Sequence, residues 1–250
     1  MFKKQIKINN INLTYYQKGK GETILFFHGG RLRALPFIKI FKKIYNNYEV
    51  IIPDIPGFGE SNLSKQINSF SKYGNFFLKF LKKIKKNNVI VVGYSFGGGI
   101  AINMINSPNK IIKKIIIINS SGIINSNQSK LIQDLKRFIF YLTNFRYFKI
   151  FFTLIKEWFY FYFNHFKDLK YLTKIRKNEN KLNFTKIKKP LIIIWSKNDD
   201  IFPLKIAKKI INSLKKPKNI LKLFITEGNH DWIFLNQKKF MKILKKALIV

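Results

Sequence analysis

The stretch VIVVGYSFGGGIAI, residues 89–102, decides the fold prediction because its character changes around a single serine, Ser95. The β-branched run before the serine is typical of a buried strand, and the small residues after it are typical of a helix that packs closely. A G-x-S-x-G pattern between strand and helix forces the serine into a sharp, strained turn above the sheet. Gly93 and Gly97 are expected to leave room where the two backbones approach.

The rest of the chain alternates short apolar runs with helical patterns, which predicts crossover units and a mostly parallel central sheet with helices on both faces. Residues 4–19 are expected to open the fold as an antiparallel pair of strands. The expected buried strands are 23–29, 49–55, 89–94, 114–121, 190–199 and 220–230. The expected helices are 35–45, 70–84, 97–106, 204–214 and 237–248.

Residues 123–185 break this alternation, because they hold no strand pattern but contain the most aromatic stretch, NFRYFKIFFTLIKEWFYFYFNHF, at 144–166. We expect a helical insertion here, within a core formed by residues 1–122 and 186–250. Its apolar residues fall on two sides of a helix, which predicts two buried surfaces rather than one. One side holds Phe148, Phe152 and Ile155, and the other holds Tyr147, Phe151, Leu154 and Trp158.

Three interpretations of the aromatic insertion stay open at this point. Both sides of the helix pack within the insertion and onto the core, or one side walls an apolar pocket. The third is contact with a membrane interface, since charged residues interrupt the run too often for a spanning helix.

The high positive charge of the chain bears on which partners it binds. The 48 basic residues against 12 acidic ones give a net charge of +36, which invites a nucleic-acid or anionic-membrane interpretation. Only five of these basic residues are arginines, and the lysines are spread along the chain with Ile, Asn and Phe, as A/T-rich codon usage produces. We therefore expect a solvated lysine surface with no specific nucleic-acid partner, and at most weak contact with an anionic membrane surface.

The N-terminal segment and the missing residue types bear on location and cofactors. The sequence MFKKQIKINNINL has no continuous apolar core like that of a signal peptide, and no later run of about 18 uncharged apolar residues follows, so we expect a soluble, cytoplasmic protein. The absence of cysteine excludes disulfides and thiolate metal sites.

A serine hydroxyl is a weak nucleophile, so Ser95 needs a base within hydrogen-bond reach and a third group that orients the base. His28, in LFFHGG, is expected to shape a turn, and His165, in the aromatic insertion, is expected to be a surface or packing residue. His230, in ITEGNHDW, follows the last predicted strand at the sheet's carboxyl edge, where ligand sites of open α/β folds collect. His230 is therefore the predicted base.

The acid of the site is also expected at a strand end. WSKNDDIFP offers Asp199 and Asp200, of which Asp199 is preferred, with Asp200 left as the alternative. Asp231 adjoins His230 too closely to reach its ring, and a loop or capping role is expected for it. The amide of Phe96, at the N-terminus of the helix after Ser95, would point to where an oxyanion forms.

With nucleophile, acid and histidine in that order, as GYSFGG, WSKNDDIFP and EGNH, the chain resembles the α/β-hydrolase superfamily over nearly its whole length. The resemblance makes residues 93–97 the nucleophile elbow, implies an oxyanion-hole amide at Gly30 in HGGRLRAL, and matches 123–185 to a helical cap. It also matches PDIPGFGESN to a turn beside the pocket. The matching residues of that turn, read as structural, are Asp54, Gly57, Gly59 and Ser61.

Departures from subfamily patterns narrow the implied chemistry. HGGR lacks the further glycine of hormone-sensitive-lipase-like esterases and the Pro-Gly continuation of proline iminopeptidases. Serine stands at position 95, where haloalkane dehalogenases and epoxide hydrolases of this fold carry aspartate.

The resulting prediction is a serine hydrolase of the carboxylesterase or monoacylglycerol-lipase type, acting on a small ester with an apolar acyl or alcohol group and needing no metal or organic cofactor. The alternatives are an amide or carbon–carbon bond hydrolase of the same fold, and a ligand-binding member without turnover.

Overall fold

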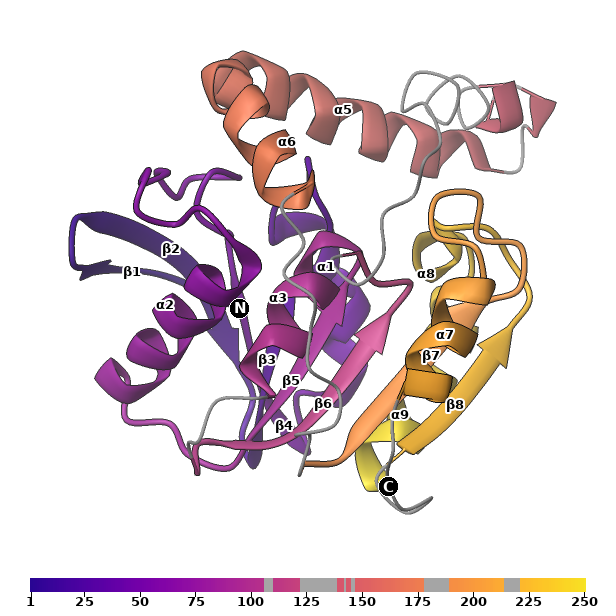
Figure 1. Cartoon of the computed structure of the whole chain (residues 1–250). Helices are drawn as coiled ribbons and strands as arrows, with labels where there is room; N and C mark the ends of the chain where they lie inside the picture. The colour runs from indigo at the N-terminus through magenta and orange to yellow at the C-terminus, as the bar shows by residue number, and fades with distance from the viewer. Residues whose placement is uncertain (106–109, 122–138, 142, 145–146, 178–188, 214–220) are drawn as a thin grey trace.

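An eight-stranded sheet forms the centre of the computed structural model, which describes residues 1–105, 110–121, 139–141, 143–144, 147–177, 189–213 and 221–250 (Figure 1). The strands are β1 (Phe2–Ile8), β2 (Ile11–Lys18), β3 (Glu22–Phe27), β4 (Tyr48–Pro53), β5 (Val89–Tyr94), β6 (Ile112–Ile118), β7 (Leu191–Ser196) and β8 (Leu221–Thr226). Their order across the sheet is β1-β2-β4-β3-β5-β6-β7-β8. β2 pairs antiparallel with β1 and β4, and all other pairs are parallel. The predicted α/β-hydrolase architecture is confirmed.

The central strands are apolar throughout because helices cover both faces of the sheet. Every residue of β5 and β7 is buried. Along β3, Leu25 and Phe27 point to one apolar cluster, while Ile24 and Phe26 point to the other, as the two-residue repeat of a strand requires. The sheet therefore separates two hydrophobic cores.

Most of the helices fill these two layers. The helices are α1 (Leu35–Phe41), the 3-10 helix η1 (Lys42–Ile44), α2 (Phe70–Lys83), α3 (Phe96–Met104), α5 (Phe148–His165), the 3-10 helix η3 (Phe166–Asp168), α6 (Leu169–Lys177), α7 (Lys205–Ser213), α8 (Trp232–Leu235) and α9 (Gln237–Ile249). Helices α2, α3 and α7 pack on one face of the sheet, α1, α8 and α9 pack on the other, and α5 and α6 lie outside these two layers. The expected helix 35–45 is α1 continued by η1, and α3 begins at Phe96 rather than Gly97.

Helices α5 and α6 lie over the carboxyl ends of the parallel strands (Figure 1). Both predicted limits of the cap, 122/123 and 185/186, fall outside the described residues. Phe151 and Leu154 on one side of α5 are buried, but Phe148 and Phe152 on the other side are exposed. The expectation that both sides are buried is therefore wrong, because periodicity shows which residues share a side but not what covers it. Within the described ranges, no helix combines the length and apolar content needed to cross a bilayer.

A buried lysine joins the sheet to the last helix. Lys114 of β6 donates from Nζ to the carbonyl oxygen of Leu248 at 2.5 Å and lies 3.5 Å from that of Ala247. The last carbonyls of a helix have no partner within it, and a cation there offsets the negative end of the helix dipole. Lys114 thus caps α9 from the neighbouring strand.

We predict that Lys114→Met lowers the free energy of unfolding by about 1–3 kcal/mol, because buried charge-assisted hydrogen bonds are lost while the aliphatic packing is kept. Thermal unfolding monitored by circular dichroism measures the change. The control is Lys113→Met, whose ammonium is exposed and pairs with Glu22 at the surface, where an ion pair contributes about 0–1 kcal/mol. Equal effects of the two variants would contradict the capping role.

Candidate active site

The turn between β5 and α3 holds Ser95 in a strained conformation. Its φ of 52° and ψ of −117° lie outside the ordinary regions for a residue with a side chain. A Cβ added at Gly93 would lie 2.3 Å from the Gly97 carbonyl oxygen, and one at Gly97 would lie 2.4 Å from that of Phe27. Only glycine fits at these two positions, for the reason expected from the sequence.

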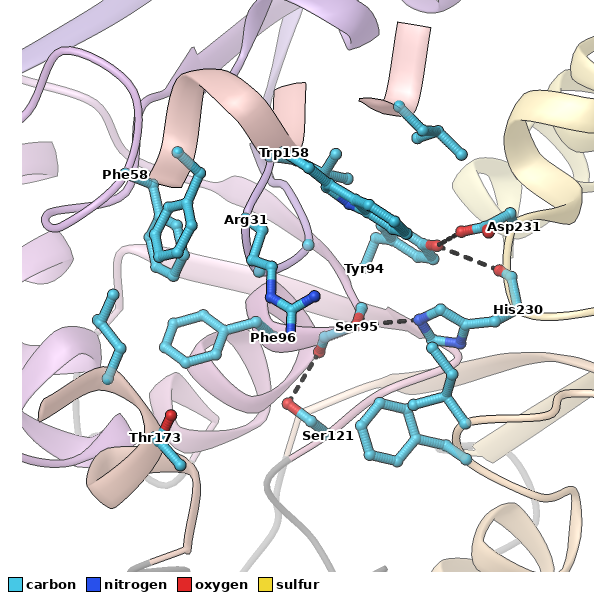
Figure 2. A pocket seen from close by; sticks show the side chains of 18 of the residues that line it. Arg31, Phe58, Tyr94, Ser95, Phe96, Ser121, Trp158, Thr173, His230 and Asp231 are labelled. Carbon is cyan, nitrogen blue, oxygen red and sulfur yellow. Dashed lines mark hydrogen bonds between the residues drawn. The ribbon is translucent and has the colours of Figure 1, made fainter. Parts of the chain in front are cut away.

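Ser95, His230 and Asp199 form one continuous hydrogen-bonded chain. The Ser95 Oγ lies 3.0 Å from His230 Nε2 (Figure 2). On the other side of the ring, His230 Nδ1 lies 2.9 Å from Asp199 Oδ2 and 3.0 Å from Oδ1. A hydrogen on Nδ1 is donated to the carboxylate, which leaves the Nε2 lone pair to accept the serine hydroxyl proton. The three residues follow β5, β8 and β7, so the sheet edge brings them together.

Asp199 is held by more than the histidine. Its Oδ1 also accepts hydrogen bonds from the amides of Ile201 at 2.8 Å and Phe202 at 2.7 Å. Burial raises the pKa of the Asp199 carboxyl above its ordinary value, and the charge and hydrogen bond of His230, together with the two amides, act in the opposite direction. The amides and the ring keep this buried group oriented toward the imidazole.

The neighbouring Asp200 contacts the main chain of His230 and not its ring. Its Oδ1 accepts from the main-chain amide of His230 at 3.0 Å, whereas Asp199 contacts the ring. The ring itself is sandwiched by aromatic groups, with Tyr94 stacked at 5.2 Å between centroids and Phe202 edge-on at 5.5 Å. The rotamer of His230 is thus fixed by packing as well as by hydrogen bonds.

Gly30 and Phe96 lie together beside Ser95. Both line the same cavity, and a Cβ added at Gly30 would lie 3.6 Å from the Phe96 Cβ. Phe96 is the first residue of α3, so its amide has no acceptor within the helix. The amide of Gly97 donates to the carbonyl of His28 at 3.1 Å, which ties the HGG loop to the start of α3.

His28 joins two loops under the site. It is fully buried, its Nδ1 donates to the carbonyl of Gly29 at 2.8 Å, and its Nε2 accepts from the amide of Ile55 at 3.1 Å. Burial lowers the pKa of His28 to about 4, so the ring is neutral at physiological pH. The structural role expected from the sequence fits these contacts.

Asp54 organises the glycine-rich turn. Its carboxylate accepts from the amides of Ala34 at 2.7 Å and Glu60 at 3.0 Å, and a Cβ on Gly59 would lie 2.3 Å from its Cγ. Gly57 and Gly59 have φ of 88° and 57°, which the tight bend requires. Ser61 accepts from the Thr14 amide through its hydroxyl at 3.0 Å.

A cavity of about 120 Å³ adjoins Ser95 under α5 and α6. Its apolar wall includes Phe58, Leu154, Trp158, Phe161, Leu169, Leu172 and Phe202. Arg31 and Ser121 add polar groups close to Ser95 (Figure 2). The Arg31 guanidinium lies 5.7 Å from the ring centroid of Tyr162 and 6.0 Å from that of Trp158. One side of the cap helix therefore lines a pocket that has an apolar wall and polar groups close to Ser95.

Polar contacts fasten the cap over this pocket. Arg33 Nε donates to Glu157 Oε2 at 2.8 Å, with both side chains largely buried, and its guanidinium lies 3.9 Å from the ring centroid of Tyr160. His165 is buried, and its Nε2 donates to the Gly59 carbonyl at 2.8 Å. The packing role expected for His165 thus includes a hydrogen bond to the turn that Asp54 organises.

Asp231 is a buried residue of the site whose contacts sequence reasoning missed. Its Oδ2 accepts from the Tyr141 hydroxyl at 2.9 Å, and its Oδ1 lies 3.2 Å from the Tyr94 hydroxyl. Of the two roles expected for Asp231, the capping role is wrong, because its side chain makes no hydrogen bond to the start of α8, whereas the residue does lie in the loop before that helix. No local pattern signals a contact between residues 90 positions apart. Among the residues described, no three His, Asp or Glu side chains converge to hold a metal ion.

Comparison with known proteins agrees with this fold. Residues 22–157 match the family model described as alpha/beta hydrolase fold. The chain is 30% identical to the pimeloyl-[acyl-carrier protein] methyl ester esterase of Wigglesworthia glossinidia brevipalpis, over 89% of this chain and 92% of that protein. It is 23% identical to the uncharacterized hydrolase YugF of Bacillus subtilis (strain 168), over 87% and 88%.

Solved structures share the architecture. The enol-lactonase from Burkholderia xenovorans LB400 superposes with a TM-score of 0.84 at 13% identity, covering 99% of this chain and 100% of that one. The esterase EaEST from Exiguobacterium antarcticum gives 0.77 at 16% identity, with 97% of each chain covered. At these identities the likeness shows the fold alone.

We predict that Gly93→Ala lowers the free energy of unfolding by about 3 kcal/mol, because the new Cβ meets backbone that cannot move without opening the elbow. Gly30→Ala is the matched control, since its Cβ would make an ordinary contact at 3.6 Å and should cost less than about 0.5 kcal/mol. Urea unfolding of both variants measures the difference. A Gly93→Ala variant as stable as Gly30→Ala would show that the elbow is not this tightly packed.

The Asp54 carboxyl predicts a pH dependence of stability. Burial raises its pKa from 3.8 to about 6, although the Ala34 and Glu60 amides oppose the shift. Between these values the folded protein holds the proton more tightly than the unfolded chain, so the contribution is complete below about pH 4 and is lost as the pH rises through 6. Asp54→Asn does not titrate here. Wild type should therefore lose about 3 kcal/mol relative to this variant between about pH 4 and 7.

Urea unfolding of both proteins across this pH range measures the effect as a difference between wild type and variant. Comparing the two removes the contribution of every other titrating group. A difference that stays constant with pH, or grows as the pH rises, would contradict the assignment to Asp54.

Proposed function

The chain belongs to the alpha/beta hydrolase fold family, and we propose that it is a serine hydrolase that cleaves carboxylic esters with an apolar acyl or alcohol group. The observation that carries the proposal is the hydrogen-bonded chain of Ser95, His230 and Asp199 at one edge of an apolar cavity. A hydroxyl bonded to an imidazole that is itself oriented by a carboxylate is the arrangement that activates a serine nucleophile.

The first half of the proposed reaction forms an acyl-enzyme. Ser95 Oγ attacks the ester carbonyl carbon while His230 Nε2 takes the hydroxyl proton, and the Asp199 carboxylate stabilises the resulting imidazolium. The amides of Gly30 and Phe96 donate to the oxyanion of the tetrahedral intermediate. When the intermediate collapses, the carbon–oxygen bond to the alcohol breaks, and His230 gives its proton to the leaving oxygen.

The second half releases the acid by the same groups. A water molecule attacks the acyl carbon while His230 Nε2 accepts one of its protons, and the same two amides hold the new oxyanion. Collapse breaks the bond to Ser95 Oγ, which recovers its proton from His230, and the carboxylic acid leaves. The proposed reaction consumes one water molecule for each ester cleaved, and none of its steps uses a metal or organic cofactor.

The apolar wall supports the proposed substrate class. Leu154, Trp158 and Phe161 of α5 line the cavity together with Leu169 and Leu172 of α6, and this part of the wall favours a hydrocarbon group over a charged one. The Wigglesworthia relative is a methyl ester esterase by name, which agrees with ester chemistry. Amide and carbon–carbon bond hydrolysis would use the same three residues and are the alternatives within this fold. A ligand-binding member without turnover is disfavoured because Ser95, His230 and Asp199 are all present and aligned.

Hydrolysis of p-nitrophenyl esters of increasing acyl length tests the proposal. We expect Ser95→Ala to lower kcat/KM by about 10⁴-fold or more, and Asp199→Asn to lower it by about 10³–10⁴-fold because the imidazole loses its orientation. Asp200→Asn is the matched control, since Asp200 contacts the main chain of His230 and should change kcat/KM by less than about tenfold.

Three other outcomes would contradict separate parts of the proposal. Full activity in Ser95→Ala would contradict the mechanism, and equal losses in the two aspartate variants would contradict the role of Asp199. If a folded wild type hydrolyses amides or diketones but no ester, the nucleophile stands and the substrate class is wrong.

A further inference from the structure

A row of exposed phenylalanines runs along the outer side of the cap. Phe152, Phe159 and Phe163 of α5 are 53%, 73% and 92% exposed, and Phe166 in the following turn is 66% exposed. At about 100° per residue, the three positions within α5 fall within an arc of roughly 40°, and Phe166 directly follows the end of the helix. They form one stripe, called here the α5 aromatic stripe.

The stripe is distinct from the side of α5 that walls the cavity. Leu154 and Phe161 are buried there and lie more than 90° around the helix from the stripe on the same geometry. Other exposed large apolar side chains of the described surface, such as Phe2, Leu35 and Ile225, lie on separate elements. A contiguous aromatic row on a surface marks an interaction site, whereas single exposed apolar residues need no explanation.

Positive charge flanks the stripe. Lys156, Lys167 and Lys170 are exposed on or just beyond α5. The acidic side chains of residues 147–177 are Glu157, which is buried against Arg33, and Asp168, which contacts His165. The surroundings of the stripe are therefore cationic, in a chain whose net charge is +36.

We propose that the α5 aromatic stripe docks this protein on an anionic lipid bilayer. The helix would lie in the plane of the interface, with the phenylalanine rings between the lipid headgroups and the acyl chains and the lysines beside the lipid phosphates. This orientation is accessible because the rings of the stripe are exposed and α5 lies over the carboxyl ends of the strands (Figure 1). Aromatic rings next to lysines suit an anionic membrane better than an acidic protein surface, which offers no apolar layer.

The two sides of α5 give this docking a consequence. The candidate pocket lies on the other side of the same helix, so a docked protein holds it about one helix diameter, roughly 10 Å, from the lipid. An ester dissolved in the bilayer would then reach the pocket without crossing bulk water. This consequence depends on the proposed esterase function, whereas the docking does not.

Co-sedimentation with vesicles tests the docking. With vesicles of phosphatidylcholine and phosphatidylglycerol at low salt, we expect wild type to bind and the double variant Phe159→Ser/Phe163→Ser to bind at least about tenfold more weakly. Vesicles of phosphatidylcholine alone should bind wild type far less. The matched control is Phe2→Ser, which removes an equally exposed phenylalanine, at 72%, from the strand β1 and should bind like wild type.

A fluorescent probe locates the contact. Phe163→Trp should shift its emission to the blue when anionic vesicles are added, and Phe2→Trp should not. Unchanged vesicle binding by the double serine variant would overturn the proposal and assign binding to the lysine surface in general. Wild type that binds no anionic vesicle, but self-associates through the stripe in sedimentation equilibrium, would overturn it in favour of a second copy of this chain.

Neither phenylalanine lines the cavity, so the double variant should hydrolyse a water-soluble ester as wild type does. Ser95→Ala should bind vesicles normally. Failure of the docking and failure of the esterase proposal are therefore observed separately.

Discussion

The backbone of Ser95 is the constraint on which the rest of the site depends. A residue with a side chain at φ 52° and ψ −117° costs roughly 1–3 kcal/mol and persists only when its surroundings hold it. Here the end of β6 and the residues after it hold the turn, because the Ser95 amide donates to the carbonyl of Ile118 and the Ser95 carbonyl accepts from the amide of Ser121, each at 3.0 Å. Glycines at 93 and 97 allow strand and helix to close on the turn. The same turn presents the serine hydroxyl and the start of α3 to one point in space.

Features of the fold and the site that neighbouring residues determine can be predicted from the sequence, and contacts between distant residues cannot. Buried parallel strands are apolar throughout, and G-x-S-x-G fits few other turns, so the sheet and the elbow can be predicted from neighbouring residues. The local sequence gives little reason to prefer Asp199 over Asp200, because both follow the same strand. In the structure, Asp199 contacts the ring of His230 and Asp200 contacts its main-chain amide. The contact of Asp231 with Tyr141 has no local signal. For α5, periodicity separates two apolar sides, but burial depends on which side the core meets.

The cap is fixed to the core by polar contacts around an apolar pocket. The buried pair of Arg33 and Glu157 and the hydrogen bond from His165 to Gly59 position α5 without filling the space beside Ser95. Such buried polar contacts fix geometry more than they add stability, because desolvation offsets much of their attraction. The two sides of α5 therefore differ, since its inner side lines the pocket and its outer side carries the aromatic stripe.

We propose that the geometry around Ser95 makes this one hydroxyl a nucleophile among the many serines of the chain. Reaction of the folded protein with a fluorophosphonate, followed by mass spectrometry of its peptides, measures this directly, because the oxygen of an activated serine displaces fluoride from the reagent and forms a stable phosphonate ester, whatever the natural substrate is. We predict a single adduct, on Ser95, that forms much more slowly when Asp199 is replaced by Asn. No adduct on the folded protein, or an adduct on a neighbouring hydroxyl such as that of Ser121, would contradict it.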